Sequence, residues 1–358
     1  GRGQHVEFGN AGRDDINAIL KVRDRLGSTG SAIVQSVRCK RILLARKTVH
    51  CNRHLTTEKA IDEVAHLSRL SHSHVVRVIG TYTIRNELSI LIFLVAEWDL
   101  KQFLDREVQP THIGDPSYND TFSSLTRFLI CIANAMEYIH SNMTKYMDIK
   151  PRNLLVRRRR IRTEEDIALA RYKIYVADFG IARSYTSLEV AETEGPTSFN
   201  RKYAATEVVD REKRGLTADI FFMGCVFIEI FTSILEHLEP KEGSVVVERG
   251  CQVSNHREHL RILLRDNEYG DTSYQANLPA LYTYISGLAS GFDLDTLRVS
   301  LAFSSGLLYS DFLKMAKQMV DKDPTRRPSA EALVLDLGSG PCCERLSDAL
   351  EAEEKSGN

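Results

Sequence analysis

Four polar residues in the middle of the chain carry side chains suited to phosphoryl transfer. Asp148, Lys150 and Asn153 share the string Asp-Ile-Lys-Pro-Arg-Asn, and Asp178 opens a later Asp-Phe-Gly string that follows a strand-like run. A carboxylate can orient an acceptor hydroxyl, an ammonium group can neutralise phosphate charge, and carboxylate and amide oxygens can hold Mg²⁺. The alternative is that Asp148 and Asn153 only shape a turn, as both residue types do. The second string favours the chemical interpretation.

The residues before position 96 predict a small β-sheet with one helix. β-branched residues and alternation predict strands within 19–49, 75–83 and 88–94. Residues 56–70 predict a helix, because apolar residues recur there at intervals of three or four. The first twenty residues are polar and predict an irregular segment.

From position 97 the pattern changes to helices. Apolar residues between 125 and 139 trace one face of a long amphipathic helix. Residues 219–232 are almost entirely apolar and predict a buried central helix, too short to cross a bilayer. The other expected elements are a short helix at 100–104, a turn-rich loop at 110–119, strands at 153–156 and 172–177, an inserted loop with short helices at 236–275, and helices at 312–320 and 329–337.

Composition bounds the class of protein. Of 358 residues, 43% are hydrophobic and 27% charged, and the net charge of −1 leaves no electrostatic footprint for nucleic acid or an anionic membrane. No apolar stretch approaches the roughly 20 residues of a membrane span. Seven scattered cysteines without metal-ligand spacing favour reduced thiols and an intracellular, cytoplasmic location. The run from Arg157 to Arg160 predicts an exposed hairpin insertion, with a nucleic-acid or acidic-partner patch as the alternative.

The two polar strings resemble those of the protein kinase family, whose catalytic loop reads H-R-D-L-x-x-x-N ahead of a D-F-G string. The resemblance implies that Asp148 accepts or orients the proton of the substrate hydroxyl and that Lys150 neutralises the γ-phosphate. It assigns Asn153 and Asp178 as Mg²⁺ ligands. A lysine two residues after this aspartate accompanies serine/threonine specificity in the family. ATP and a protein hydroxyl are therefore the implied substrates.

The same resemblance places ATP against the first lobe. Lys47 ends a Leu-Ala-Arg-Lys string that resembles V-A-I-K, and would bind the α- and β-phosphates with Glu63 as its ion-pair partner. A solvated strand lysine at this position, and Glu58 as the rival partner, are the alternatives. Backbone groups of residues 93–95 would bind adenine. The remaining nucleotide-binding positions implied by the resemblance are Gly27, Thr29, Val34, Ala45, Phe93 and Val95.

Two further pairings follow from the resemblance. Glu207 ends an Ala-Thr-Glu string where the family has A-P-E, and would pair with Arg327 in a late Asp-Pro-Thr-Arg-Arg-Pro string. Asp219 would brace the backbone of the catalytic loop. Capping of its own helix is the alternative for Asp219, and both roles can hold.

The implied fold is α+β and bilobed, with a small mainly-β N-lobe carrying one main helix and a larger mainly-α C-lobe. The expected division is an N-terminal extension at 1–19, the N-lobe at 20–96, the C-lobe at 97–337 and a tail at 338–358.

Several positions depart from the family pattern. Met147 replaces an arginine that in many members pairs with a phosphorylated activation-segment residue, which predicts activity independent of such phosphorylation. The other departures are Thr29 and Ala32 for roof glycines, Tyr146 for histidine, Asn200 for threonine and Thr206 for proline. They leave open a pseudokinase scaffold that acts through protein contacts, and an enzyme that phosphorylates a small molecule. The oligomeric state is also open.

Overall fold

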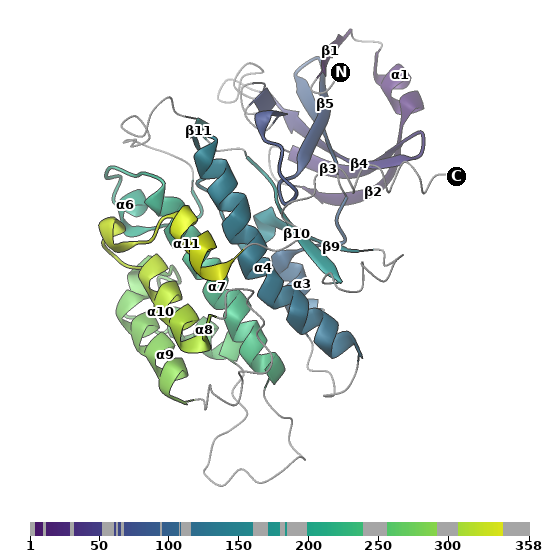
Figure 1. Ribbon diagram of the computed structural model, residues 1–358. Helices are drawn as coiled ribbons and strands as arrows, with labels where there is room; N and C mark the ends of the chain where they lie inside the picture. Colours follow the sequence, from purple (N-terminus) through teal and green to yellow (C-terminus); the bar gives the residue numbers. More distant parts are fainter. Residues whose placement is uncertain are drawn as a thin grey trace.

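The protein has a small, mainly β N-terminal lobe and a larger, mainly helical C-terminal lobe (Figure 1). This computed structural model confirms the predicted bilobed α+β fold. It describes residues 4–9, 12–28, 32–51, 61, 64–65, 68–93, 95–106, 108, 116–159, 171–179, 183–184, 199–238, 256–291 and 307–338.

A six-stranded sheet forms the N-terminal lobe, in the order β1-β5-β6-β4-β3-β2. All neighbours are antiparallel except β1, which is parallel to β5. Val37 and Leu44 lie opposite each other in register and are both buried, as expected when paired residues point to one face of a sheet. The strands are β1 (Gln4–Phe8), β2 (Leu20–Ser28), β3 (Ala32–Cys39), β4 (Ile42–His50), β5 (Arg77–Ile84) and β6 (Glu87–Phe93).

The prediction of an irregular segment over the first twenty residues is wrong. They contain strand β1 and helix α1 (Gly12–Ile19). Phe8 packs edge-on against Tyr82 of β5 with ring centroids 5.9 Å apart, and Ile16 of α1 is buried. The pairing partner of β1 lies far along the chain, so its short local pattern could not reveal it.

The predicted helix of the N-terminal lobe is present in the part that the structure describes. Positions 61, 64, 65, 68 and 69 are helical, and Val64 and Leu70 are buried in the core. Residues 52–60 and Glu63 lie outside the described part.

Helix α7 (Thr217–Leu238) is the central element of the C-terminal lobe. Its segment Thr217–Glu236 is long and apolar enough to cross a membrane, which corrects the prediction that no stretch reaches that length, yet 94% of the apolar window is buried. Burial identifies it as a core helix, as predicted. A Cβ at Gly224 would lie 2.8 Å from Met319 Cβ, so the glycine allows close packing against α10. The other helices are α3 (Leu100–Arg106), α4 (Pro116–Ser141), α6 (Thr206–Val209), α8 (His256–Arg265), α9 (Leu278–Gly291), α10 (Tyr309–Met319) and α11 (Ala330–Leu337).

Helices of the C-terminal lobe also differ from the prediction. Helix α4 begins at Pro116, inside the expected loop, because proline suits the first turn of a helix. Helix α9 was not predicted, since its sequence is apolar on nearly every side and shows little periodicity.

A second, three-stranded sheet joins the lobes, in the order β10-β9-β7. It consists of β7 (Trp98–Asp99), β9 (Leu154–Arg158) and β10 (Tyr172–Val176), and the antiparallel β9–β10 pair was predicted. The Val176 amide donates to the His74 carbonyl at 2.7 Å, and the Val76 amide donates to the Val176 carbonyl at 3.0 Å. These bonds fix the loop before β5 to the C-terminal lobe.

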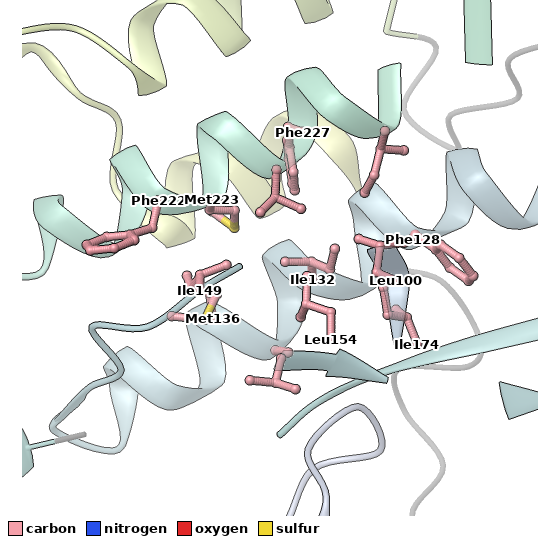
Figure 2. Packing of buried hydrophobic residues seen from close by; sticks show 14 of the residues in the cluster. Leu100, Phe128, Ile132, Met136, Ile149, Leu154, Ile174, Phe222, Met223 and Phe227 are labelled. Carbon is pink, nitrogen blue, oxygen red and sulfur yellow. The ribbon is translucent and has the colours of Figure 1, made fainter. Parts of the chain in front are cut away.

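The core beneath this sheet lies between α4 and α7. Figure 2 shows Met136 of α4 and Met223 of α7 on either side of Ile149, which belongs to the Asp-Ile-Lys-Pro-Arg-Asn string. Ile149 is fully buried. The apolar residue inside the polar string therefore anchors the loop on the central helices.

Candidate active site

The carboxylate of Asp219 supports the backbone of the polar loop at 146–153. The carboxylate of Asp219 accepts the backbone N–H of Tyr146 at 2.8 Å and that of Met147 at 2.6 Å. Asp219 is fully buried near the start of α7, so a rigid helix carries this support. The predicted bracing contact is present.

A third partner of Asp219 was not predicted. The Nε2 atom of His140, in the last turn of α4, lies 3.1 Å from Asp219 Oδ2. No local sequence pattern indicates this contact, because it joins two helices that lie far apart in the chain.

Asp148 is the centre of a hydrogen-bonded group within the same loop. Lys150 Nζ lies 2.8 Å from Asp148 Oδ1 and 2.6 Å from Oδ2. Asn153 Nδ2 donates to Oδ2 at 2.7 Å and to the Asp148 carbonyl at 2.9 Å. The structure thus brings the three predicted residues of the loop together, with the carboxylate held in one orientation.

Burial raises the pKa of the Asp148 carboxyl above its ordinary value, and the nearby Asp178 charge acts in the same direction. The Lys150 hydrogen bond and charge oppose the shift without cancelling it. A carboxylate with a raised pKa is a better proton acceptor than an exposed aspartate.

We expect a raised acidic limit in the pH profile of phosphoryl transfer. If Asp148 takes the proton of an acceptor hydroxyl, as the resemblance implies, it can do so only when ionised. The kcat should then fall as the pH drops through its pKa, at a higher pH than an ordinary aspartate near 3.9 would give. The measurement is kcat for a serine peptide against pH, with ATP affinity measured at each pH as the control. An acidic limit at or below the ordinary aspartate range would contradict the assignment.

Asp178 follows β10 and faces the N-terminal lobe. Its Oδ1 lies 2.6 Å from Lys47 Nζ of β4, with the two side chains 44% and 20% exposed. Asp178 has a positive φ of 63°, a conformation that costs a non-glycine residue about 1–2 kcal/mol. Local strain held at a charged position is typical of functional sites.

Tyr146 holds the turn that carries Asp178. Its hydroxyl donates to the carbonyl of Ala177, and its ring packs edge-on against Phe179 at 4.9 Å between centroids. The Ala177 amide in turn donates to the Asn153 carbonyl at 2.9 Å. The substitution of tyrosine for histidine therefore preserves a link between the two polar strings.

The residues present fit a magnesium ion. With the Asn153 Nδ2 donating to Asp148, its amide oxygen is the atom left to bind a cation, and Asp178 supplies a partly exposed carboxylate. These hard oxygen ligands are the kind that Mg²⁺ prefers.

The predicted nucleotide-binding positions that the structure describes lie on adjacent strands, except Val95, which follows β6. Gly27 pairs with Val34, and Val34 pairs with Lys47, so the roof strands and the lysine share one part of the sheet. Ala45 pairs with Ile92 next to the predicted hinge. Phe93 is buried and Val95 half-buried, whereas Thr29 and Glu63 lie outside the described residues. The predicted pairing of Lys47 with Glu63 therefore stays a prediction.

The predicted pair of Glu207 and Arg327 is present and buried. The guanidinium donates to both carboxylate oxygens, at 2.6 Å and 2.9 Å, and the two side chains are 4% and 0% exposed. This contact fixes α6 to the segment before α11.

The bilobed fold and the loop group formed by Asp148, Lys150 and Asn153, with Asp178 after the next strand pair, are those of a protein kinase domain. The chain belongs to the protein kinase family, since the family model described as "Protein kinase domain" matches residues 20–336.

Curated relatives are similar to parts of this chain. Cyclin-dependent kinase 4 of Mus musculus is 31% identical over 178 residues, which is 48% of this chain and 51% of the relative. Cyclin-dependent kinase E-1 of Arabidopsis thaliana is 29% identical over 175 residues, 48% of this chain and 34% of the relative. A putative wall-associated receptor kinase-like 11 of Arabidopsis thaliana is 23% identical over 223 residues, 59% of this chain and 24% of the relative. The chain thus spans about half or less of the length of these relatives.

Proposed function

We propose that the chain is an ATP- and Mg²⁺-dependent protein serine/threonine kinase that transfers the γ-phosphoryl group of ATP to a protein hydroxyl. The observation that carries this proposal is the Asp148 carboxylate, oriented by Lys150 and Asn153. Serine/threonine specificity rests on Lys150, two residues after the aspartate. The Glu207–Arg327 pair, which belongs to the protein kinase activation segment, favours a protein acceptor over a small molecule.

Each residue has a distinct role in the proposed reaction. Asp148 orients the acceptor hydroxyl and takes its proton, while Lys150 neutralises charge on the transferred group. Lys47 binds the α- and β-phosphates, and Asn153 with Asp178 holds Mg²⁺. When bound, Mg²⁺ neutralises charge on the β- and γ-phosphates. The 2.6 Å contact between Lys47 and Asp178 places the proposed phosphate-binding lysine beside the proposed Mg²⁺ ligand.

Replacing Asp148 with asparagine is expected to lower kcat by roughly 10²- to 10⁴-fold, because general base catalysis is lost while the shape is kept. The assay measures transfer from labelled ATP to matched serine and tyrosine peptides, with Asp336→Asn as a control at an exposed site. Activity of Asp148→Asn within threefold of wild type would refute the mechanism, and preference for the tyrosine peptide would refute the specificity.

A pseudokinase scaffold is the second candidate. The observation that favours it is the direct Lys47–Asp178 pair, which occupies a group needed for ATP and a group needed for Mg²⁺. A scaffold would show no turnover on any acceptor while it keeps its protein partners. A nucleotide-induced rise in melting temperature with Mg²⁺, together with turnover, would favour the enzyme.

We expect activity to persist after phosphatase treatment. Met147 is 2% exposed and has no charge, so it cannot pair with a phosphorylated residue as arginine does. Treated and untreated protein should differ by less than about twofold in kcat, since no phosphate-dependent contact is lost at this position. Abolition of activity, with rescue on rephosphorylation of Thr193 or Thr197, would contradict this expectation. Both threonines lie outside the described residues.

A cytoplasmic location is part of the proposal. Its support is the state of the cysteines, since Cys39, Cys51 and Cys225 are thiols outside any disulfide in the part of the chain that the structure describes.

A further inference from the structure

A turn at 200–204 presents a lysine and a tyrosine to the central helix α7. The Asn200 carbonyl accepts the amides of Tyr203 at 3.2 Å and Ala204 at 3.1 Å, and its side-chain oxygen accepts the amide of Lys202 at 3.1 Å. Burial raises the pKa of Tyr203, while the charge of Arg152 acts in the opposite direction. Glu229 of α7 holds this turn, and Asp219 of the same helix holds the loop at 146–153, so one helix supports both segments.

Side chains of the turn donate hydrogen bonds to a single carboxylate of the central helix. Glu229 Oε1 accepts hydrogen bonds from Lys202 Nζ, the Tyr203 hydroxyl and the Tyr274 hydroxyl, each at 3.0 Å. The Lys202 ammonium also lies 5.0 Å from the ring centroid of Tyr203 and 5.7 Å from that of Tyr274. We call these four residues the Glu229 cluster.

The Glu229 cluster is a cation site filled by a residue of the chain itself. A carboxylate flanked by two aromatic rings attracts ammonium or guanidinium groups. The site is reachable from solvent, because the Lys202 side chain is 38% exposed and that of Glu229 is 18% exposed. The neighbouring carboxylate of Asp271 is taken by Arg201 at 2.8 Å.

We propose that Lys202 is a specificity-determining residue, which fills the Glu229 cluster and thereby excludes arginine or lysine side chains of the acceptor protein from this position. The inference rests on the proposed function, since it concerns the acceptor of the same site. An incoming cation meets a like charge at Lys202 and has to displace it from three polar and aromatic partners. Removal of Lys202 leaves a partly buried carboxylate that a basic acceptor residue can neutralise.

The test measures peptide binding, which does not require turnover. Fluorescent alanine-rich peptides, each with one serine and one arginine at a different position, are titrated against the full chain by anisotropy. The variants are Lys202→Met, which keeps the apolar stem over the tyrosine rings, Lys202→Gln, and the double change Lys202→Met with Glu229→Gln. Lys314→Met is the matched control, because it removes the same charge from an exposed ion pair. Melting temperatures establish that each variant is folded.

We expect wild type and Lys314→Met to bind all peptides alike. Lys202→Met and Lys202→Gln should bind the peptide with arginine at one particular position about tenfold more tightly, and the double change should remove this gain. If no arginine peptide binds the Lys202 variants more tightly than wild type, the inference is overturned. The same holds if the gain in affinity survives the added change Glu229→Gln. Peptide binding without phosphoryl transfer would refute the proposed kinase activity and leave the role of Lys202 standing.

Discussion

Replacing Asp178 with alanine is expected to lower kcat/KM for Mg²⁺-dependent phosphoryl transfer by at least about 10³-fold. In the proposed mechanism Asp178 supplies a carboxylate ligand for Mg²⁺ together with the amide oxygen of Asn153, and it lies 2.6 Å from Lys47. Without it, Lys47 and Lys150 alone would have to neutralise the phosphate charge. The measurement is initial rate against ATP and Mg²⁺ concentration for the variant and wild type.

The same change should barely affect stability. Asp178 is 44% exposed, so its ion pair with Lys47 contributes at most about 1 kcal/mol, and the melting temperature should move by less than about 4 °C. Asp311→Ala is the matched control, because Asp311 is 45% exposed and lies 3.0 Å from Lys314. That control should keep full activity. Retention of activity within tenfold in Asp178→Ala would remove Asp178 from the proposed mechanism.

The sequence predicted much of the catalytic loop because its residues are close in the chain. Asp148, Lys150 and Asn153 meet within one turn, so residue types and spacing together define their geometry. The Glu207–Arg327 pair and the support from Asp219 span longer distances, and they were predicted only through the resemblance to a family.

The contacts that were not predicted all depend on tertiary structure. The parallel pairing of β1 with β5, the contact of His140 with Asp219 and the Glu229 cluster each join segments that no local pattern relates. The Lys47–Asp178 pair joins the two lobes in the same way. Periodicity reports which face of an element is buried, but it does not say which element covers that face.

We expect the buried pair of Glu207 and Arg327 to make a large contribution to the free energy of unfolding. All five N–H groups of Arg327 have acceptors: two are the oxygens of Glu207, and three are the carbonyls of Thr217, Asp321 and Lys322. The guanidinium also lies 5.0 Å from the ring centroid of Phe221. A buried cation with this set of partners is stable only while its counter-charge is present.

Glu207→Gln should therefore lower the free energy of unfolding by about 3–5 kcal/mol, because it leaves the Arg327 charge buried without a counter-charge. Arg327→Met should cost a similar amount by leaving Glu207 unpaired. The double change Glu207→Gln with Arg327→Met should cost clearly less than the sum of the two, since no charge is then left buried alone. Urea unfolding followed by tryptophan fluorescence and circular dichroism measures all three.

Arg326→Met is the control for this cycle, because Arg326 neighbours Arg327 but is 73% exposed and lies 3.6 Å from Asp323. It should change the free energy of unfolding by less than about 0.5 kcal/mol. If Glu207→Gln costs no more than that control, or if the two single changes simply add, the pair does not anchor α6 to the segment before α11. The position of residues 199–209 in the C-terminal lobe would then depend on other contacts, of which the Glu229 cluster is the first to test.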